Sequence, residues 1–282
     1  MTRGLHETQH EARHATRGIT AAAAIVALVL AAPLLAQQVK VDLGKETVGK
    51  TPKTFVPFMG TWVVVQDGPD KVIKVDGTGY KATLDTPSRL LLENVRKMYG
   101  TSNEELLDNA KQFTTFPVAV LQGVDNFTNG TISVKFKTIS GEADRCSGIL
   151  FNVKPNGDWL TLRYNDTEHN VVLWEFHNGV RRPLIRPRDG TLLSAPGDRE
   201  KWHELKLTVD GANITGTLDG TDVLHYKLDD PPQPGRNGAA PNPDLLPANN
   251  PLLQPPVKGK VGLWSKTDST SEFKDYVITH AK

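Results

Sequence analysis

The stretch Gly-Thr-Ile-Ser-Val-Lys-Phe-Lys, residues 130–137, decides the fold class. Its apolar residues, Ile132, Val134 and Phe136, occupy every second position, and small or charged residues lie between them. Successive side chains of a β-strand point to opposite faces of the sheet. The pattern therefore predicts a strand with one buried face and one polar face.

The same alternation returns further along the chain. It recurs in residues 159–164, 172–176 and 204–209. Tight-turn sequences lie near the ends of these stretches: Pro155-Asn156-Gly157, Asn178-Gly179, Asp210-Gly211 and Asp219-Gly220. Short strands in series with such turns predict antiparallel pairs that form a sandwich or a barrel.

Other segments complete an expected single domain of residues 37–282. Residues 60–66 and 72–75 are rich in β-formers and flank a Gly-Pro turn. Residues 86–111 carry apolar residues at three- and four-residue spacing and a capping box, which predicts a short helical insertion. Residues 229–258 form a proline-rich loop, because proline cannot donate a hydrogen bond to a central strand.

Residues 1–36 are typical of a signal peptide. Arginines precede an apolar run over residues 19–35, and Ala36 is a small residue suited to cleavage. An uncleaved membrane anchor is the alternative, because the run approaches the ~20 residues that a membrane span needs. We therefore expect a bacterial protein that is secreted or periplasmic.

The net charge and the cysteine content exclude some classes of partner and of covalent cross-link. The formal net charge is +1 and no basic stripe is present, so we expect no nucleic-acid partner, and no membrane contact beyond the possible anchor. Cys146 is the only cysteine, which excludes an intramolecular disulfide. Its apolar neighbours predict a small buried residue.

Several stretches together resemble a known group of proteins. They are residues 130–137, 147–151, 156–165, 201–207 and 259–269. They are similar to the concanavalin A-like lectin/glucanase superfamily, of the laminin-G-like jelly-roll kind, near the 3-keto-disaccharide hydrolase domain family. This resemblance implies an all-β, antiparallel two-sheet jelly-roll sandwich with a short helical insertion.

The resemblance also indicates a ligand site on the concave sheet face. Relatives carry an Arg-x-Asn-x-x-Glu-x-Asn pattern, which reads here Arg163, Asn165, Glu168 and Asn170. An arginine with amides and a carboxylate can hydrogen-bond sugar hydroxyls, and Trp159 offers a ring for stacking. The alternative is a structural role, in which Arg163 and Glu168 form an ion pair and the two asparagines satisfy turn backbone.

The alternation assigns different faces to Trp174 and Glu175. We expect Trp174 to fill the core with Val172 and Phe176, as most strand aromatics do. We expect Glu175 on a solvated outer face. Burial would raise its pKa and suit it to acid–base chemistry.

Catalysis is only weakly indicated. The glucanases of this fold place carboxylates at alternate positions of one strand, and no such run occurs; Glu142-Ala-Asp144 follows a glycine and looks like a turn. Glu168 and Glu175 are the weak catalytic candidates for a hydrolase or lyase acting on 3-keto-disaccharides. The dispersed histidines do not indicate zinc.

We expect no cofactor, with calcium at Asp268 or Asp166 as a minor alternative. The expected function is a non-catalytic protein that binds a glycan or oligosaccharide on the concave face. The alternatives are the glycoside-cleaving enzyme and a non-enzymatic interaction domain at the cell surface.

Overall fold

Strand β6 (Gly130–Ser140) confirms the alternation over residues 130–137. Ile132, Val134 and Phe136 are buried, and the residues between them are partly exposed. The computed structural model describes residues 37–78, 93, 96–98, 116–185, 199–230, 240, 243 and 246–281. All of them belong to one compact unit, Ala36–Lys282.

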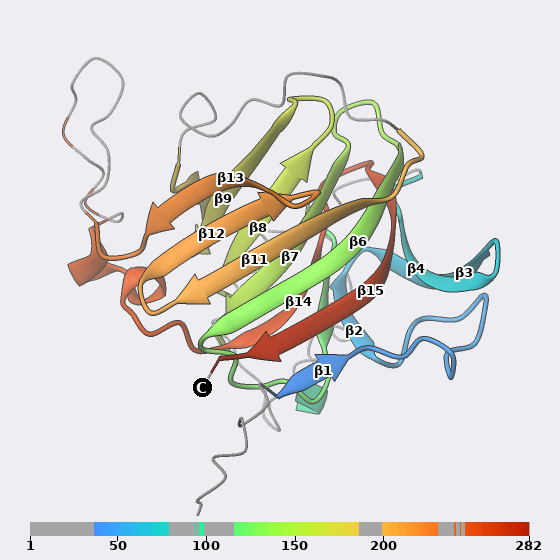
Figure 1. The fold of residues 1–282 in the computed structure, drawn as a ribbon, viewed down its shortest axis with the longest axis horizontal. Helices are drawn as coiled ribbons and strands as arrows, with labels where there is room; N and C mark the ends of the chain where they lie inside the picture. Colours follow the sequence, from blue (N-terminus) through green and yellow to red (C-terminus); the bar gives the residue numbers. More distant parts are fainter. Residues whose placement is uncertain are drawn as a thin grey trace, which may run out of the picture. The chain divides into compact units, whose positions relative to one another are not determined.

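The described strands form two antiparallel sheets (Figure 1). Sheet A has the order β13-β12-β11-β6-β15-β4-β3, with β1 paired to β15. Besides β6, its strands are β1 (Gln38–Lys40), β3 (Thr61–Asp67), β4 (Asp70–Asp76), β11 (His203–Asp210), β12 (Asn213–Leu218), β13 (Thr221–Lys227) and β15 (Thr270–His280).

Sheet B has the order β10-β9-β8-β7-β14-β5-β2. Its strands are β2 (Phe55–Met59), β5 (Val118–Leu121), β7 (Cys146–Val153), β8 (Trp159–Asn165), β9 (Asn170–His177), β10 (Val180–Pro183) and β14 (Lys260–Trp264). The all-β, two-sheet jelly-roll sandwich expected from the sequence is therefore confirmed.

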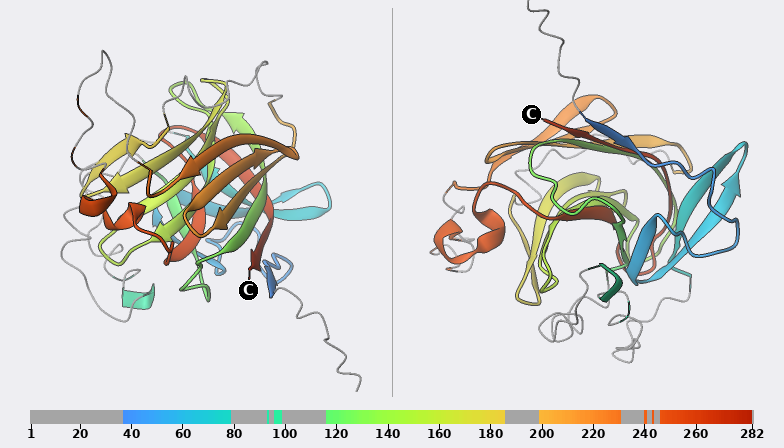
Figure 2. Two further views of the ribbon diagram at one scale, coloured as in Figure 1. Left: turned by 60° about the vertical axis from the view of Figure 1, so that its left-hand side comes forward. Right: turned by 90° about the horizontal axis from the view of Figure 1, so that it is seen from below.

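The main core lies between the sheets, which Figure 2 shows as nested curved layers. Phe136 and Leu207 from sheet A and Phe151 and Leu162 from sheet B are fully buried in it. Each such side chain contributes about 1.5–3 kcal/mol by leaving water. The edge hairpin of β3 and β4 adds Trp62, which packs in the same core.

The central strands of sheet B are buried on both of their faces. Every residue of β7 and β8 is buried, whereas β6 and β11 of sheet A alternate. We call the side of sheet B that is turned away from sheet A the inner face. A second apolar cluster covers it: Phe58, Met59, Phe116, Val118, Val120, Cys146, Leu150, Val153, Trp159, Phe176 and Trp264, with Met98 packed against them.

Cys146 is fully buried in this cluster, as predicted. Burial raises the pKa of its thiol to about 12. The thiol is therefore protonated at neutral pH and is a poor nucleophile.

The prediction that Trp174 fills the core is wrong. Leu162, Val171 and Leu173 supply the apolar layer between the sheets, and Trp174 lies on the inner face, partly exposed. Val172 and Phe176 alternate with the core residues in the same way. Alternation separates the two faces of a strand but does not say which of two apolar faces meets the second sheet.

The described part of the proline-rich loop contains no strand. It forms two short 3₁₀ turns, η3 (Pro247–Asn249) and η4 (Pro251–Leu253), and Leu252 and Leu253 are buried in the main core. The predicted signal peptide lies outside the described residues. So does the predicted helical insertion, apart from residues 93 and 96–98, which are helical. Within the described chain, we find no helix with the length and apolarity that a membrane crossing requires.

Candidate functional site

Strands β8 and β9 place alternate residues on the inner face. Their antiparallel register pairs Thr161 with Trp174 and Arg163 with Val172. Directly paired residues of two antiparallel strands share a face of the sheet. These four side chains therefore lie on the inner face, on the opposite side from core residues such as Leu162.

Arg163 is held by a network within the β8–β9 hairpin. Its Nη2 donates to Glu168 Oε2 at 2.7 Å and to Asn170 Oδ1 at 2.6 Å. The guanidinium side chain is 1% exposed, whereas the Glu168 side chain is 45% exposed. Partial burial alone would raise the pKa of Glu168, but the charge and hydrogen bond of Arg163, with smaller contributions from Asn170 and Lys266, hold it below its ordinary value.

The two asparagines of the pattern organise the turn. Asn165 Oδ1 accepts from the backbone N–H groups of Thr167 at 2.8 Å and Glu168 at 3.3 Å, and its amide donates to Asp144. Asn170 Nδ2 donates to Glu168 Oε2 at 3.3 Å. The structure thus brings all four pattern residues together, and most of their side-chain hydrogen bonds are with one another and with the turn.

Strand β10 adds Arg181, which the sequence analysis missed. Arg181 is in register with Phe176, so it also lies on the inner face. Its Cζ lies 3.5 Å from the ring centroid of Trp174, 5.2 Å from that of Phe116 and 5.5 Å from that of Trp264. The Asn178-Gly179 turn was the available signal, because a tight hairpin turn fixes which residues of its two strands are paired.

Burial lowers the pKa of Arg181 to about 10, and the nearby charge of Arg163 acts in the same direction. Arg163 is also close to Trp174, with its Cζ 5.3 Å from the ring centroid. Two guanidinium groups therefore share one indole ring, and a pKa of about 10 leaves Arg181 charged at neutral pH.

Four inner-face residues carry a buried polar atom without a hydrogen-bond partner in the described part of the chain. We call them the polar quartet: Thr161 (Oγ1), Arg163 (Nε), Trp174 (Nε1) and Arg181 (Nη2). An unsatisfied buried polar group costs about 1–3 kcal/mol. Four of them on one face mark a surface that is suited to an oxygen-rich partner.

Gly148 gives Trp264 room on this face. Gly148 pairs with both Trp264 and Arg163, so the three lie in one row across β14, β7 and β8. A Cβ at position 148 would lie 3.2 Å from Trp264 Cε3 and 2.9 Å from the carbonyl oxygen of Leu162. Any larger residue would therefore displace the indole or the backbone.

Trp159 lies on the inner face but does not present an open ring. Its ring stacks on Phe176, with centroids 4.3 Å apart and an interplanar angle of 9°, and the residue is 3% exposed. Thr161, Arg163 and Trp174 of the polar quartet lie further along β8 and β9, whereas Arg181 on β10 is in register with Phe176.

The expectation that Glu175 is solvated is wrong. Glu175 is fully buried on the core side of β9, where it pairs with Arg182 at 3.3 Å and accepts a hydrogen bond from Asn250. Burial raises its pKa. Since Glu168 contacts Arg163 on the inner face, the two weak catalytic candidates lie on opposite sides of sheet B and do not flank one substrate.

The two aspartates considered for calcium are bonded within the protein. Asp268 accepts from the backbone N–H groups of residues 142–144, and Asp166 pairs with Arg145 at 2.7 Å. The described residues contain no group of three or more His, Cys, Asp or Glu side chains that could hold a metal ion.

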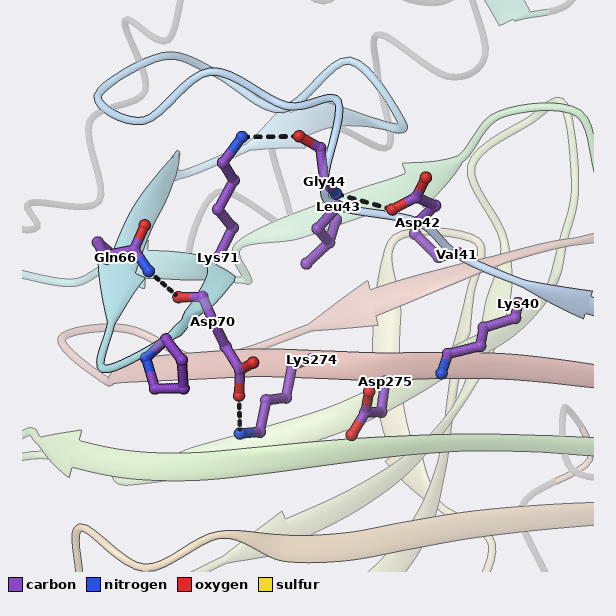
Figure 3. Close-up of a pocket in the computed structure, with 11 residues that line it drawn as sticks. Lys40, Val41, Asp42, Leu43, Gly44, Gln66, Asp70, Lys71, Lys274 and Asp275 are labelled. Atoms are coloured by element: carbon purple, nitrogen blue, oxygen red, sulfur yellow. Dashed lines mark hydrogen bonds and ion pairs between the residues drawn. The ribbon is translucent and has the colours of Figure 1, made fainter.

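A groove of about 660 Å³ lies on the other sheet, between the segment after β1 and the β3–β4 hairpin (Figure 3). Lys71 donates to the Gly44 carbonyl at 2.7 Å, and Asp70 pairs with Lys274 at 2.7 Å. Asp275 pairs with Lys135 at 3.0 Å. These charged groups already have protein partners, so the groove is a weaker candidate than the inner face.

Comparisons with known proteins give similarities in structure alone. No family model and no curated protein matches the chain. The carbohydrate-binding module CBM66 from Bacillus subtilis has a TM-score of 0.48 at 13% identity, with 83% of this chain and 99% of that chain covered. A β-glucanase from Bacillus licheniformis has a TM-score of 0.40 at 11% identity, with coverages of 87% and 92%.

A third similar structure is a putative glycosyl hydrolase from Parabacteroides distasonis. Its TM-score is 0.41 at 17% identity, with 59% of this chain and 87% of that chain covered. At such TM-scores and identities, the similarity specifies neither a ligand nor a reaction.

Proposed function

We propose that this protein is an exported carbohydrate-binding jelly-roll protein that holds a glycan against the inner face of sheet B. The observation that supports this proposal is the polar quartet, in which Arg181 lies beside the aromatic rings of Trp264 and Phe116. Trp174 and Arg181 are partly exposed, so a ligand reaches the quartet at these two residues.

Sugar chemistry suits this surface. Each sugar hydroxyl both donates and accepts hydrogen bonds, and the C–H faces of the ring pack against aromatic side chains. Binding sites of this type combine apolar walls with a few fixed polar groups. Ligand oxygens would accept from Arg163, Trp174 and Arg181 and exchange a hydrogen bond with Thr161.

The pattern residues take part indirectly in this proposal. Glu168 and Asn170 hold the Nη2 of Arg163, whereas its Nε is buried and has no hydrogen-bond partner among the described residues. Asn165 fixes the turn that carries Glu168. These three are positioning residues, and the direct contacts fall to the quartet.

The positions of Glu168 and Glu175 support a protein that binds a glycan without cleaving it. Glu168 is an ion-paired carboxylate with a lowered pKa, which makes it a poor proton donor. Glu175 is on the far side of the sheet. Glycoside hydrolysis normally requires two carboxyl groups that flank the scissile bond.

A glycan array probed with the full chain and two variants tests the proposal. Thr161→Val removes the unpaired hydroxyl with little change of shape, and Thr208→Val is the matched control on β11 of sheet A, where Thr208 is partly exposed. We expect Thr161→Val to weaken glycan retention about fivefold or more, as loss of roughly 1 kcal/mol requires. Its melting temperature should stay the same or rise, because a buried unsatisfied group is removed.

Thr208→Val should leave retention unchanged. Retention of no glycan by the wild-type chain, or equal retention by both variants, would contradict the proposal. A fall in retention that only follows a fall in melting temperature would favour a structural role for Thr161.

A further inference from the structure

Arg181 is the unmatched cation of the inner face. Arg163 pairs with Glu168 at 2.7 Å, and Lys266 pairs with Asp144 at 2.8 Å. Within the described residues, Arg181 makes neither an ion pair nor a hydrogen bond, and its contacts are with aromatic rings. Asp144 and Glu168 lie near enough to act on the pKa of Arg181, but each is paired with another cation, so Arg181 has no ion-pair partner of its own among the described residues.

An unmatched charge in such surroundings is costly. A partly buried cation has lost much of its hydration, and aromatic rings replace only a part of it. The pKa of Arg181, lowered to about 10, still leaves the guanidinium charged at neutral pH. A neutral sugar would add hydrogen bonds but would leave this charge uncompensated.

The position of Arg181 favours a planar monoanion. Its Cζ is at stacking distance from Trp174, and a stacked guanidinium keeps its N–H groups pointing outward in its own plane. Nη2 is unpaired. A carboxylate accepts two parallel hydrogen bonds from such an edge, and its single negative charge matches the single positive charge of Arg181.

We propose that the glycan bound by the inner face is acidic, built from uronic acid residues, and that Arg181 binds a sugar carboxylate. This inference rests on the proposed carbohydrate binding and specifies the class of sugar. Arg163 Nε and Trp174 Nε1 then donate to neighbouring ring or hydroxyl oxygens of the same residue.

Calorimetric titration of the full chain tests this assignment. The probes are trimers of α-1,4-galacturonate, β-1,4-glucuronate and β-1,4-mannuronate, each with its methyl ester, which keeps the ring and removes the charge. The variants are Arg181→Met, Arg181→Lys and, as a matched control, Arg199→Met, since Arg199 is an exposed arginine. A sulfated neutral oligosaccharide is a further probe.

We expect at least one uronate trimer to bind about tenfold or more tightly than its ester, a difference of roughly 1.4 kcal/mol. Arg181→Met should abolish that preference, Arg181→Lys should restore part of it, and Arg199→Met should keep it. The melting temperature of Arg181→Met should not fall, because an unpaired charge is removed. A retained melting temperature then separates loss of a ligand contact from loss of folding.

Two results would overturn the inference and leave carbohydrate binding intact. One is that the wild-type chain binds the uronate trimers no more tightly than their methyl esters or neutral glycans, and that Arg181→Met leaves these affinities unchanged. The other is tighter binding of the sulfated probe than of every uronate. Failure of all of these probes and of the glycan array would refute both the inference and the proposed function.

Discussion

Arg163 brings a guanidinium to a position that is 1% exposed, and Glu168 and Asn170 are what hold it there. A buried charge is tolerated when its partners are fixed, and here the partners come from the turn that follows the same strand. The ion pair of Arg163 with Glu168 therefore differs from a surface ion pair, because its cation is buried even though Glu168 is half exposed.

Glu168→Gln should lower the free energy of unfolding by about 1 kcal/mol at pH 7, because the amide keeps a hydrogen bond but loses the charge facing Arg163. The pKa of Glu168 is lowered in the folded protein, so its contribution is present above the ordinary carboxyl pKa. It is lost as the pH falls through the folded-state value. Urea unfolding from pH 7 to pH 3 should show the two proteins converging, and Glu142→Gln, at an exposed position, should show no such effect.

A second pH dependence belongs to His177. Its Nδ1 lies 2.7 Å from Asp158, and this hydrogen bond raises the pKa of the imidazole above the ordinary 6.5. The stabilisation is fully present below pH 6.5 and is lost as the pH rises through the folded-state pKa. We expect the melting temperature to fall over that interval, and Asp158→Asn to flatten the fall. An equally steep fall in the variant would contradict this origin.

The pattern Arg163, Asn165, Glu168 and Asn170 was expected from the resemblance to related proteins, and its residues lie on one hairpin. Arg181 was missed because part of its surroundings comes from distant elements: Trp264 from β14 and Phe116, which precedes β5. The spacing of residues within one segment does not indicate which distant segments contact it in the fold. The register of the Asn178-Gly179 turn gave its face but not its neighbours.

Strands β7, β8 and β9 show how far alternation reaches. It located β8 and β9 and separated their faces, whereas β7 was expected only from the resemblance of residues 147–151. Both faces of β8 are apolar or buried, so the sequence did not distinguish the core side from the inner side. For β6 and β11 the polar face was solvated and the assignment was correct. The misplacement of Trp174 and Glu175 follows from this difference.

Gly148→Ala should test the close packing of β7 against β8 and β14. The added methyl group would meet the Leu162 carbonyl oxygen and the Trp264 ring. We expect a loss of about 1–3 kcal/mol, as overpacked positions show. Urea unfolding measures it, with Thr215→Ala on the outward side of β12 as the control. An unchanged unfolding midpoint for Gly148→Ala would mean that Trp264 and the Leu162 backbone move aside without a cost in stability.

The proline-rich segment belongs to the sandwich as a whole, because Leu252 and Leu253 lie in the core between the sheets. Leu253→Ala should therefore cost about 2–5 kcal/mol, similar to Leu207→Ala in β11. Both residues are fully buried. Chemical denaturation compares them directly, and a much smaller loss for Leu253→Ala would mean that the turn η4 is a dispensable cover.

Strand β15 lies in the middle of sheet A, between β6 and β4, and also pairs with β1, yet it follows every other described strand in the chain. During synthesis, sheet A therefore lacks the strand between β6 and β4 until residues 270–280 have left the ribosome. The strands β11, β12 and β13 can pair with β6, and β3 can pair with β4. These two parts of sheet A cannot join until β15 is available to pair with both β6 and β4. Assembly of the sandwich is thus delayed to a time after translation of this segment, and a chain that stops before Thr270 would expose both halves of an unfinished sheet to aggregation.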